Sequence, residues 1–218
     1  MSQAEGAFVV LEGIDGAGTT TQTARLAARL SADGRRAITT REPTAGPIGS
    51  LIRQALTHRL VVPGPAGPAA PSWQTMALLF AADRLDHLDA EILPQLRDGA
   101  CVISDRYDLS SLAYQSAIAD DDQAVSFIRA VNGHARRPDL TIVLHVSSTI
   151  AGERRRSRGG RAELYEHDEL QTRLAEAYRQ TDRLVPGDTV LHVDGGRPVD
   201  VVEADVHHAV ASLLASRD

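Results

Sequence analysis

The sequence predicts a three-layer α/β fold in which a parallel sheet of about five strands is flanked by helices. Short apolar runs alternate along the chain with longer segments in which apolar residues recur three and four positions apart. The first pattern is typical of buried strands and the second of helices, and helices between buried strands connect them in parallel. Because the chain has 218 residues, of which 43% are hydrophobic, we expect one domain over residues 1–218.

Phe8–Leu11 is the first of the apolar runs predicted as strands. The others are Ala37–Thr40, Cys101–Ser104, Thr141–Val146 and the weaker run Thr189–Val193. The helical pattern covers the segments Thr20–Leu30, Ile48–Leu56, Trp73–Leu96 and Asp200–Leu214. In a sheet of this kind ligands bind outside the carboxyl ends of the strands, so functional residues are expected there.

A Pro/Gly/Ala run at Val62–Pro71 cannot sustain a helix, and it predicts an exposed loop before a helix capped by Ser72. The triplet Asp120–Asp122 lacks the alternating spacing of a metal-binding loop, and we interpret it as the cap of a helix that begins near Gln123. The histidines, including the pair His207-His208, show no metal-ligand arrangement and are expected on helix surfaces or in packing.

A formal net charge of −6 argues against a general nucleic-acid binder, because such proteins present a basic face. No run approaches the roughly 18 apolar residues of a membrane span. The N-terminus also lacks the basic and apolar segments of a secretory signal, so we expect a cytoplasmic protein without membrane contact. The single cysteine, Cys101, lies in a predicted strand and is expected to be buried.

The most informative motif has the spacing of a phosphate-binding loop and lies between the first strand and the first helix. It comprises Gly13, Ile14, Asp15, Gly16, Ala17, Gly18, Thr19 and Thr20. In the usual pattern, backbone N–H groups surround the phosphates, a lysine reaches the β and γ oxygens, and the final hydroxyl holds Mg²⁺. Thr20 supplies that hydroxyl, but Thr19 replaces the lysine, and all 23 basic residues of the chain are arginine. A purely structural turn is the alternative to a phosphate site.

A second motif ends the third predicted strand, where Asp105 and Arg106 follow one another. Beside a phosphate-binding loop, a carboxylate here can hold a Mg²⁺-bound water, and an arginine can donate two hydrogen bonds to a phosphate. The alternative is a surface ion pair. Asp15, within the loop, would be repelled by phosphate oxygens unless a metal or a substrate hydroxyl engages it.

Four motifs resemble those of thymidylate kinases in order and spacing, and the resemblance spans residues 7–195. They are Glu12–Gly18, Thr40–Pro43, Leu79–Arg84, and Asp105–Tyr107 with Ser110, Ala113, Tyr114 and Gln115. The resemblance implies a P-loop kinase fold and transfer of the γ-phosphoryl group of ATP to dTMP, giving dTDP and ADP in dTTP synthesis. It also implies Mg²⁺ with the ATP, and a homodimer formed through sheet-flanking helices such as Trp73–Leu96.

The resemblance also implies where dTMP binds. Phe80 matches the aromatic residue that stacks on thymine, Arg84 the arginine at the carbonyl edge of the base, and Tyr114 the tyrosine that favours deoxyribose. The family pattern further implies Arg53 and Arg106 at the monophosphate, Ser111 at a base-contacting position, Gln115 as a substrate contact, and Asp15 near the 3′-hydroxyl. From the residues alone, Phe80 and Tyr114 could instead be packing residues, and Arg41 with Glu42 could be a local ion pair.

An arginine-rich segment, Gly152–Arg161, follows the fourth strand and corresponds to the family's mobile lid, expected over residues 152–166. Family members without an arginine in the P-loop tend to supply catalytic arginines from this lid. The resemblance therefore implies catalytic roles, beside Asp15 and Arg106, for one or more of Arg154, Arg155, Arg156, Arg158 and Arg161. A solvated charged face is the alternative. The segment Glu163–Glu166 departs from the family motif and leaves the acting arginine open.

The expected reaction needs no general base, because the second pKa of a phosphate monoester is about 6 and the acceptor oxygen is mostly deprotonated at neutral pH. Catalysis then depends on in-line positioning and on neutralising charge. Two rival functions stay open at this point. One is a kinase for another nucleoside monophosphate or for a deoxynucleoside, and the other is a non-catalytic nucleotide-binding protein.

Overall fold

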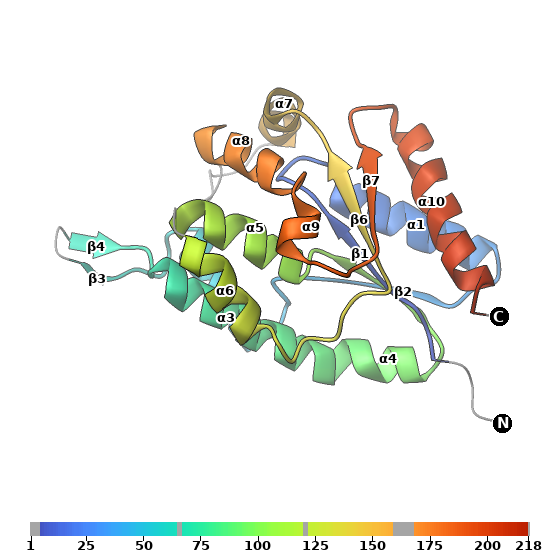
Figure 1. Ribbon diagram of the computed structural model, residues 1–218, viewed down its shortest axis with the longest axis horizontal. Helices are drawn as coiled ribbons and strands as arrows, with labels where there is room; N and C mark the ends of the chain where they lie inside the picture. Colours follow the sequence, from blue (N-terminus) through green and yellow to red (C-terminus); the bar gives the residue numbers. More distant parts are fainter. Residues whose placement is uncertain (1–4, 65–66, 120–121, 159–167, 218) are drawn as a thin grey trace.

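The central sheet has five parallel strands in the order β2-β5-β1-β6-β7. The computed structural model describes residues 5–64, 67–119, 122–158 and 168–217. The strands are β1 Phe8–Glu12, β2 Ala37–Arg41, β5 Cys101–Asp105, β6 Leu140–His145 and β7 Val190–Asp194. Helices cover both faces of this sheet (Figure 1), which confirms the predicted three-layer α/β fold. Each predicted strand begins and ends within one residue of its observed bounds.

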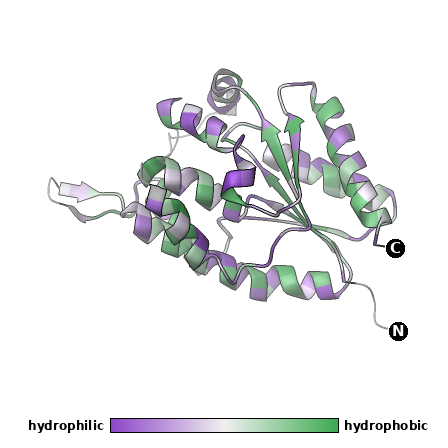
Figure 2. Ribbon diagram, in the orientation of Figure 1, coloured by the Kyte–Doolittle hydropathy of each residue, from purple (hydrophilic) through white to green (hydrophobic). Residues whose placement is uncertain are grey.

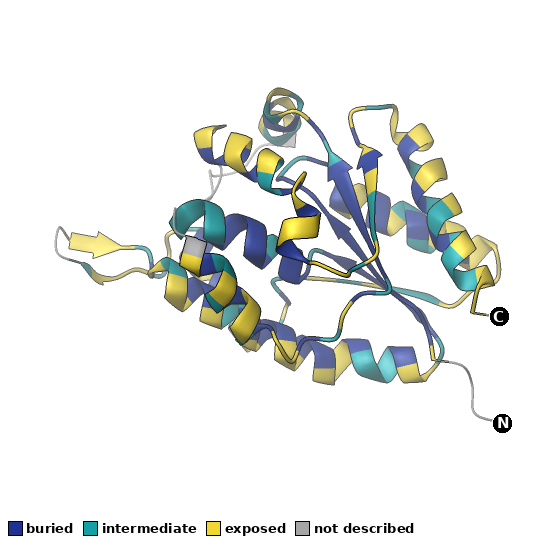
Figure 3. Ribbon diagram, in the orientation of Figure 1, coloured by how far each residue is buried: buried dark blue, intermediate teal, exposed yellow. Residues whose placement is uncertain are grey.

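The central strand, β1, is buried on both faces, and its side chains alternate between two apolar layers. Phe8 and Val10 pack with side chains of η1 (Leu88–Ile92) and α4 (Leu93–Arg97). Val9 and Leu11 belong to the larger cluster, which includes side chains of α1 (Thr19–Ala32) and α10 (Val199–Ala215). The inner strands β1, β5 and β6 are accordingly hydrophobic and almost entirely buried, whereas the edge strands β2 and β7 are partly exposed (Figures 2 and 3). Full burial of each such side chain contributes about 1.5–3 kcal/mol, which fixes the end of β1 in place.

Two helical layers surround the sheet. In one, α1 packs against α10, β2 and β5. In the other, α5 contacts α3, α6 and α8. The remaining helices are α2 Pro47–Leu56, α3 Trp73–His87, α5 Asp108–Ala119, α6 Asp122–Val131, α7 Ser148–Arg158, α8 Asp168–Ala177 and α9 Thr181–Leu184. Helix α6 begins close to the predicted start at Gln123, whereas Asp120 and Asp121 lie outside the described residues.

The helix predicted for Trp73–Leu96 is confirmed, and its interior contains a π-helical turn. The helix consists of α3, this turn at Leu88–Ile92 and α4. Pro94 lacks the N–H that would donate to the carbonyl group of Ala90, and a π-helical turn just before a proline accommodates the missing hydrogen bond. The predicted cap is confirmed, since the side chain of Ser72 accepts a hydrogen bond from the backbone N–H of Thr75 at 3.2 Å.

The loop predicted over Val62–Pro71 is instead a two-stranded antiparallel hairpin, β3 (Val62–Gly64) and β4 (Gly67–Ala69). It projects from the body of the protein and is largely exposed (Figures 1 and 3). Pro63 pairs with Pro68, and neither residue has an N–H to donate. The composition of this segment favours a loop. The hairpin can still form, because the two prolines face each other at a position of the ladder that needs no hydrogen bond.

Several smaller predictions can be checked directly. Cys101 is buried in β5, and burial raises the pKa of its thiol to about 12. His207 lies on α10, where its Nε2 is 2.7 Å from Oδ2 of Asp33. No helix among the described residues combines the length and the apolar character needed to cross a membrane.

Candidate active site

The phosphate-loop motif connects the end of β1 to the start of α1. Gly16 has a φ of 96°, and a Cβ on this residue would lie 2.5 Å from the backbone oxygen of Ala151 in α7. Only glycine fits this conformation and this close approach. Gly18, with a φ of 102°, precedes the first turn of α1, where free backbone N–H groups favour an anion. The motif is therefore built as an anion-binding loop, and α7 packs directly onto it.

Thr20 and Asp105 meet between this loop and the end of β5. The hydroxyl of Thr20 donates to Oδ2 of Asp105 at 2.5 Å. Asp105 is buried, and its other oxygen, Oδ1, has no hydrogen-bond partner among the described residues. A hydroxyl and a carboxylate with a free oxygen are ligands that suit a hard divalent cation such as Mg²⁺. These two residues, predicted as the metal side of the site, are brought together.

Thr19 begins α1, and its side chain is buried at the position that a lysine usually occupies. Two arginines of α7 contact the loop instead. Nη1 of Arg155 donates to the backbone oxygen of Asp15 at 2.6 Å. Arg154 donates from Nη1 to the oxygen of Ala17 at 3.3 Å and from Nη2 to that of Gly195 at 3.1 Å. Positive charge therefore reaches the loop from α7.

The other arginines predicted to act here are placed differently. Within the described part of the chain, Arg156 makes no hydrogen bond to the phosphate loop, and its guanidinium lies near Gly152 of its own helix. Arg161 and the segment Glu163–Glu166 lie outside the described residues, as does the side chain of Arg158. Among the candidates whose side chains are described, Arg154 and Arg155 contact the phosphate loop and Arg156 does not.

A cavity of about 120 Å³ lies beside the loop and gathers most of the predicted acceptor residues. From the predicted set, its lining includes Asp15, Phe80, Arg84, Arg106, Ser111, Tyr114 and Gln115. It also includes Glu42, Pro43, Leu56, Tyr107 and Ser110. Gln115 is buried, and its Oε1 has no hydrogen-bond partner among the described residues. The cavity therefore offers an unused acceptor as well as two arginines.

Arg53 does not line this cavity. Its guanidinium donates to the backbone oxygen atoms of Pro43, at 3.1 Å, and of Thr44, and its Nη2 donates to Ser50 at 3.0 Å. The same turn is held from α3, where Asp83 accepts hydrogen bonds from the backbone N–H and the hydroxyl of Thr44 at 2.8 and 2.6 Å. Arg53 thus supports one wall of the site from behind.

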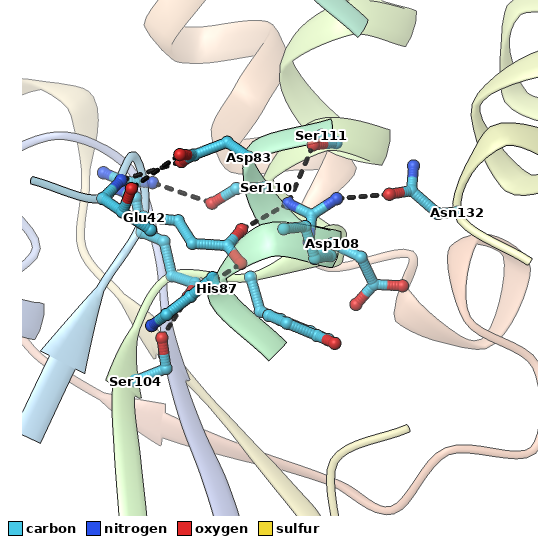
Figure 4. A network of polar contacts seen from close by, with 12 residues as sticks. Glu42, Asp83, His87, Ser104, Asp108, Ser110, Ser111 and Asn132 are labelled. Atoms are coloured by element: carbon cyan, nitrogen blue, oxygen red, sulfur yellow. Dashed lines mark hydrogen bonds and ion pairs between the residues drawn. The ribbon is translucent and has the colours of Figure 1, made fainter. Parts of the chain in front are cut away.

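Arg84 is fully buried, and its guanidinium is held from three elements. It donates to Glu42 Oε2 at 2.5 Å, to Ser111 Oγ at 3.2 Å and to Oδ1 of Asn132. It also lies 4.9 Å from the centre of the Tyr107 ring. Figure 4 shows Glu42, Ser111 and Asn132 converging on this group. A buried guanidinium needs such a partner carboxylate, and the three acceptors fix its orientation toward the cavity.

Arg106 connects the cavity with the phosphate loop. Its φ of 76° is unusual for a residue other than glycine, and such conformations cluster at functional sites. Nη2 donates to Asp15 Oδ1 at 2.6 Å, and Nη1 donates to the backbone oxygen of Gly13 at 2.8 Å. The guanidinium also lies 5.3 Å from the centre of the Tyr114 ring. The predicted partners Asp15, Arg106 and Tyr114 therefore form one cluster.

Glu12 is a further member of the site to which sequence reasoning gave no role. Its carboxyl group is fully buried at the end of β1 and accepts hydrogen bonds from the backbone N–H groups of Tyr107 and Ser110, at 2.8 and 3.1 Å. Burial raises its pKa to about 7, against the lowering influence of Arg106 and of these donors. The sequence carries one signal that could have identified Glu12, since this acidic residue ends an apolar strand immediately before the phosphate loop.

Glu42 belongs to the motif Thr40–Pro43 and could be an ion pair with Arg41, but it binds Arg84 instead. The contribution of Asn132 had no comparable local signal.

Comparisons with other proteins agree with this geometry. A family model described as thymidylate kinase matches residues 11–206. A probable thymidylate kinase of Pyrobaculum aerophilum is 40% identical over 211 residues, which cover 95% of this chain and 98% of that protein. A probable thymidylate kinase of Pyrococcus horikoshii is 36% identical over 209 residues, 96% of each chain. One of Thermococcus kodakarensis is 37% identical over 211 residues, 95% of this chain and 96% of its own.

Proposed function

The chain belongs to the thymidylate kinase family, and on this premise we propose that it transfers the γ-phosphoryl group of ATP to dTMP, giving dTDP and ADP. The observation that carries the proposal is the position of Arg106. This residue is bonded to Asp15 of the phosphate loop and lines the cavity with Phe80 and Arg84. One guanidinium therefore stands between a donor site and an acceptor site, as transfer between two nucleotides requires.

On the donor side, residues 13–20 bind the phosphates of ATP through backbone N–H groups. Thr20 and Asp105 would hold Mg²⁺ with the ATP, and the ion would neutralise negative charge on the phosphates. The free Oδ1 of Asp105 supports this assignment. Arg154 and Arg155 supply the positive charge that Thr19 cannot, because a threonine hydroxyl donates a hydrogen bond but carries no charge.

On the acceptor side, the cavity matches the parts of dTMP by chemistry. Phe80 offers an apolar ring face to the base, and Arg84 has donors for a carbonyl oxygen. The unpartnered Oε1 of Gln115 suits the ring N–H of thymine. Tyr114 limits the space at the ribose, Asp15 accepts from the 3′-hydroxyl, and Arg106 binds the monophosphate. Arg53, which lies behind the cavity wall, positions this phosphate site through the turn at Pro43 and Thr44.

The proposed reaction breaks the bond between the γ-phosphorus and the β,γ-bridging oxygen of ATP and forms a bond from the γ-phosphorus to a dTMP phosphate oxygen. That oxygen is already deprotonated, so no side chain has to accept a proton. The residues of the site act by alignment and by charge neutralisation. We place Arg155 at the transferring group, because it contacts the backbone of the loop at Asp15.

A coupled assay of ADP release tests the function. ATP·Mg²⁺ is supplied with dTMP, dUMP, dCMP or thymidine as acceptor, and turnover is expected to be fastest with dTMP. Faster turnover with another acceptor would identify a different nucleotide or nucleoside kinase. Binding of ATP without turnover on any acceptor would identify a nucleotide-binding protein instead.

Three further features belong to the proposal. The exposed apolar side chains of Leu51 on α2 and of Leu78 and Leu85 on α3 support a homodimer through these helices. We propose that residues 152–166 act as the lid of a single kinase domain, of which the described part is the end of α7. A cytoplasmic location remains a prediction from the sequence.

A further inference from the structure

We propose that Tyr178 is a positioning residue for Arg106, acting through Glu12, in the phosphoryl transfer proposed above, on which this inference rests. Tyr178 follows α8, and its side chain is buried among the loop, β1 and α5. Its hydroxyl lies 3.0 Å from Glu12 Oε2, 2.9 Å from Ser110 Oγ and 3.4 Å from Arg106 Nη1. The phenol thus contacts Arg106 itself and the two groups, Glu12 and Ser110, that lie beside it.

The chemistry of these groups determines the direction of the hydrogen bonds. A guanidinium only donates, and an ionised carboxylate only accepts. Ser110 lies 3.1 Å from Arg106 Nη1 and 2.6 Å from Glu12 Oε2, and it donates to the carboxylate. Ser110 therefore accepts from Arg106 and donates to Glu12. The hydroxyl of Tyr178 also accepts from Arg106, and it donates to Glu12 Oε2 or to Ser110 Oγ. The two hydroxyls connect the guanidinium to the buried carboxyl group of Glu12.

These hydrogen bonds leave part of Arg106 available for a phosphate. Nη1 is occupied by Gly13, Ser110 and Tyr178, and one hydrogen of Nη2 is occupied by Asp15. The second hydrogen of Nη2 and the Nε–H group make no hydrogen bond to the described residues. A guanidinium fixed along one edge presents its other donors in one orientation, which reduces the cost of binding a phosphate.

Tyr178 differs from Ser110 in the element that carries it. Ser110 lies on α5, four residues from Arg106, whereas Tyr178 comes 72 residues after Arg106. Gln171, on α8, is also fully buried, and its Nε2 lies 3.5 Å from Asp15 Oδ2. The segment of α8 and Tyr178 therefore contacts both carboxylates that hold Arg106, namely Asp15 and Glu12. Displacement of this segment would release the guanidinium.

The test is Tyr178→Phe, which keeps the ring and removes only the hydroxyl. In steady-state assays with varied dTMP and ATP, we expect kcat/KM for dTMP to fall at least about tenfold, the scale of a hydrogen bond to a charged group. KM for ATP should change less than about twofold. A melting curve of the variant establishes that it is folded. A folded variant with an unchanged kcat/KM for dTMP would overturn the proposal.

A double-mutant cycle with Arg106→Lys separates positioning from general stability. If Tyr178 acts through Arg106, adding Tyr178→Phe to Arg106→Lys should lower kcat/KM for dTMP by less than about twofold. Losses that multiply across the two substitutions would show an independent structural role and contradict the proposal. If the unsubstituted protein shows no turnover, the proposed function itself is overturned. If it turns over dTMP and Tyr178→Phe does so equally well, only the role of Tyr178 is overturned.

Discussion

The hydroxyl of Thr20 lies 2.5 Å from Oδ2 of Asp105, so the first turn of α1 and the end of β5 meet in one polar pair. Oδ1 of Asp105 has no hydrogen-bond partner in the described part of the chain, so it can accept from a bound water or bind the proposed cation. This relationship makes Asp105 the residue through which the metal requirement of the site can be measured.

Asp105→Asn removes the charge and keeps the shape of the side chain. We expect kcat to fall at least about 10²-fold, the scale of losing one preorganised electrostatic group, and the Mg²⁺ concentration needed for half-maximal rate to rise. Asp98→Asn is the control, since Asp98 is exposed and its ion pair in the described part of the chain is with Arg36 at the surface. A normal Mg²⁺ titration for Asp105→Asn would remove this residue from the metal site.

Asn132 should influence dTMP binding although it does not line the acceptor cavity. Asn132→Ala removes the oxygen that accepts from Nη1 of Arg84, leaving a buried donor unpaired at a cost of about 1–3 kcal/mol. We therefore expect KM for dTMP to rise about tenfold, with KM for ATP unchanged. Ser126→Ala provides a control on α6, the helix that ends just before Asn132, and within the described residues the hydroxyl of Ser126 donates to the backbone oxygen of Gln123. Equal values of KM for dTMP in both variants would mean that Arg84 keeps its orientation without Asn132.

Glu12 should make stability depend on pH. Its pKa is about 7 in the folded protein and 4.5 when unfolded, so the folded state binds the proton more tightly. The stability that Glu12 contributes is complete below pH 4.5 and is lost as the pH rises to about 7, because each unit of pKa difference corresponds to about 1.4 kcal/mol.

Urea unfolding of the protein and of Glu12→Gln between pH 4.5 and 8 measures this effect. The free energy of unfolding of the unsubstituted protein, relative to the variant, should fall by a few kcal/mol across this interval and level off above it. Because Glu12→Gln keeps all other titrating groups, the difference between the two unfolding curves isolates the titration of Glu12. Parallel pH curves would show that the carboxyl group titrates near its unfolded pKa.

The sequence predicts best those parts of the fold whose determinants are local. The strand at Phe8–Leu11, the glycines of the loop and the start of α1 follow from periodicity and from backbone requirements within a few residues. The hairpin at residues 62–69 escapes the same reasoning, because Pro and Gly disfavour regular structure and the pairing depends on the two segments meeting. The π-helical turn before Pro94 likewise modifies a helix whose apolar pattern continues unbroken.

The residues of the site also fall into those that the sequence identifies and those that it does not. The phosphate loop and Asp105 stand out as motifs, and the resemblance to a family selected Phe80, Arg84, Arg106 and Tyr114, which line one cavity. The residues that hold these groups are distant in the sequence. Asn132 lies 48 residues from Arg84, and Tyr178 lies 166 residues from Glu12. No spacing rule links such pairs, because only the packing of α5, α6 and α8 brings them together.

Nη1 of Arg155 lies 2.6 Å from the backbone oxygen of Asp15, beside a loop that lacks a lysine. Its charge should replace that lysine at the transferring phosphoryl group. Arg179→Ala is the matched control, because Arg179, which lies just after α8, is exposed and pairs with Glu176.

The most direct measurement is kcat with ATP·Mg²⁺ and dTMP for Arg155→Ala and for the double variant Thr19→Lys with Arg155→Ala. We predict that Arg155→Ala lowers kcat about 10²–10³-fold. The lysine restored at position 19 should then recover at least about tenfold, because it returns a charge to the loop. A kcat for Arg155→Ala equal to that of Arg179→Ala would contradict the account.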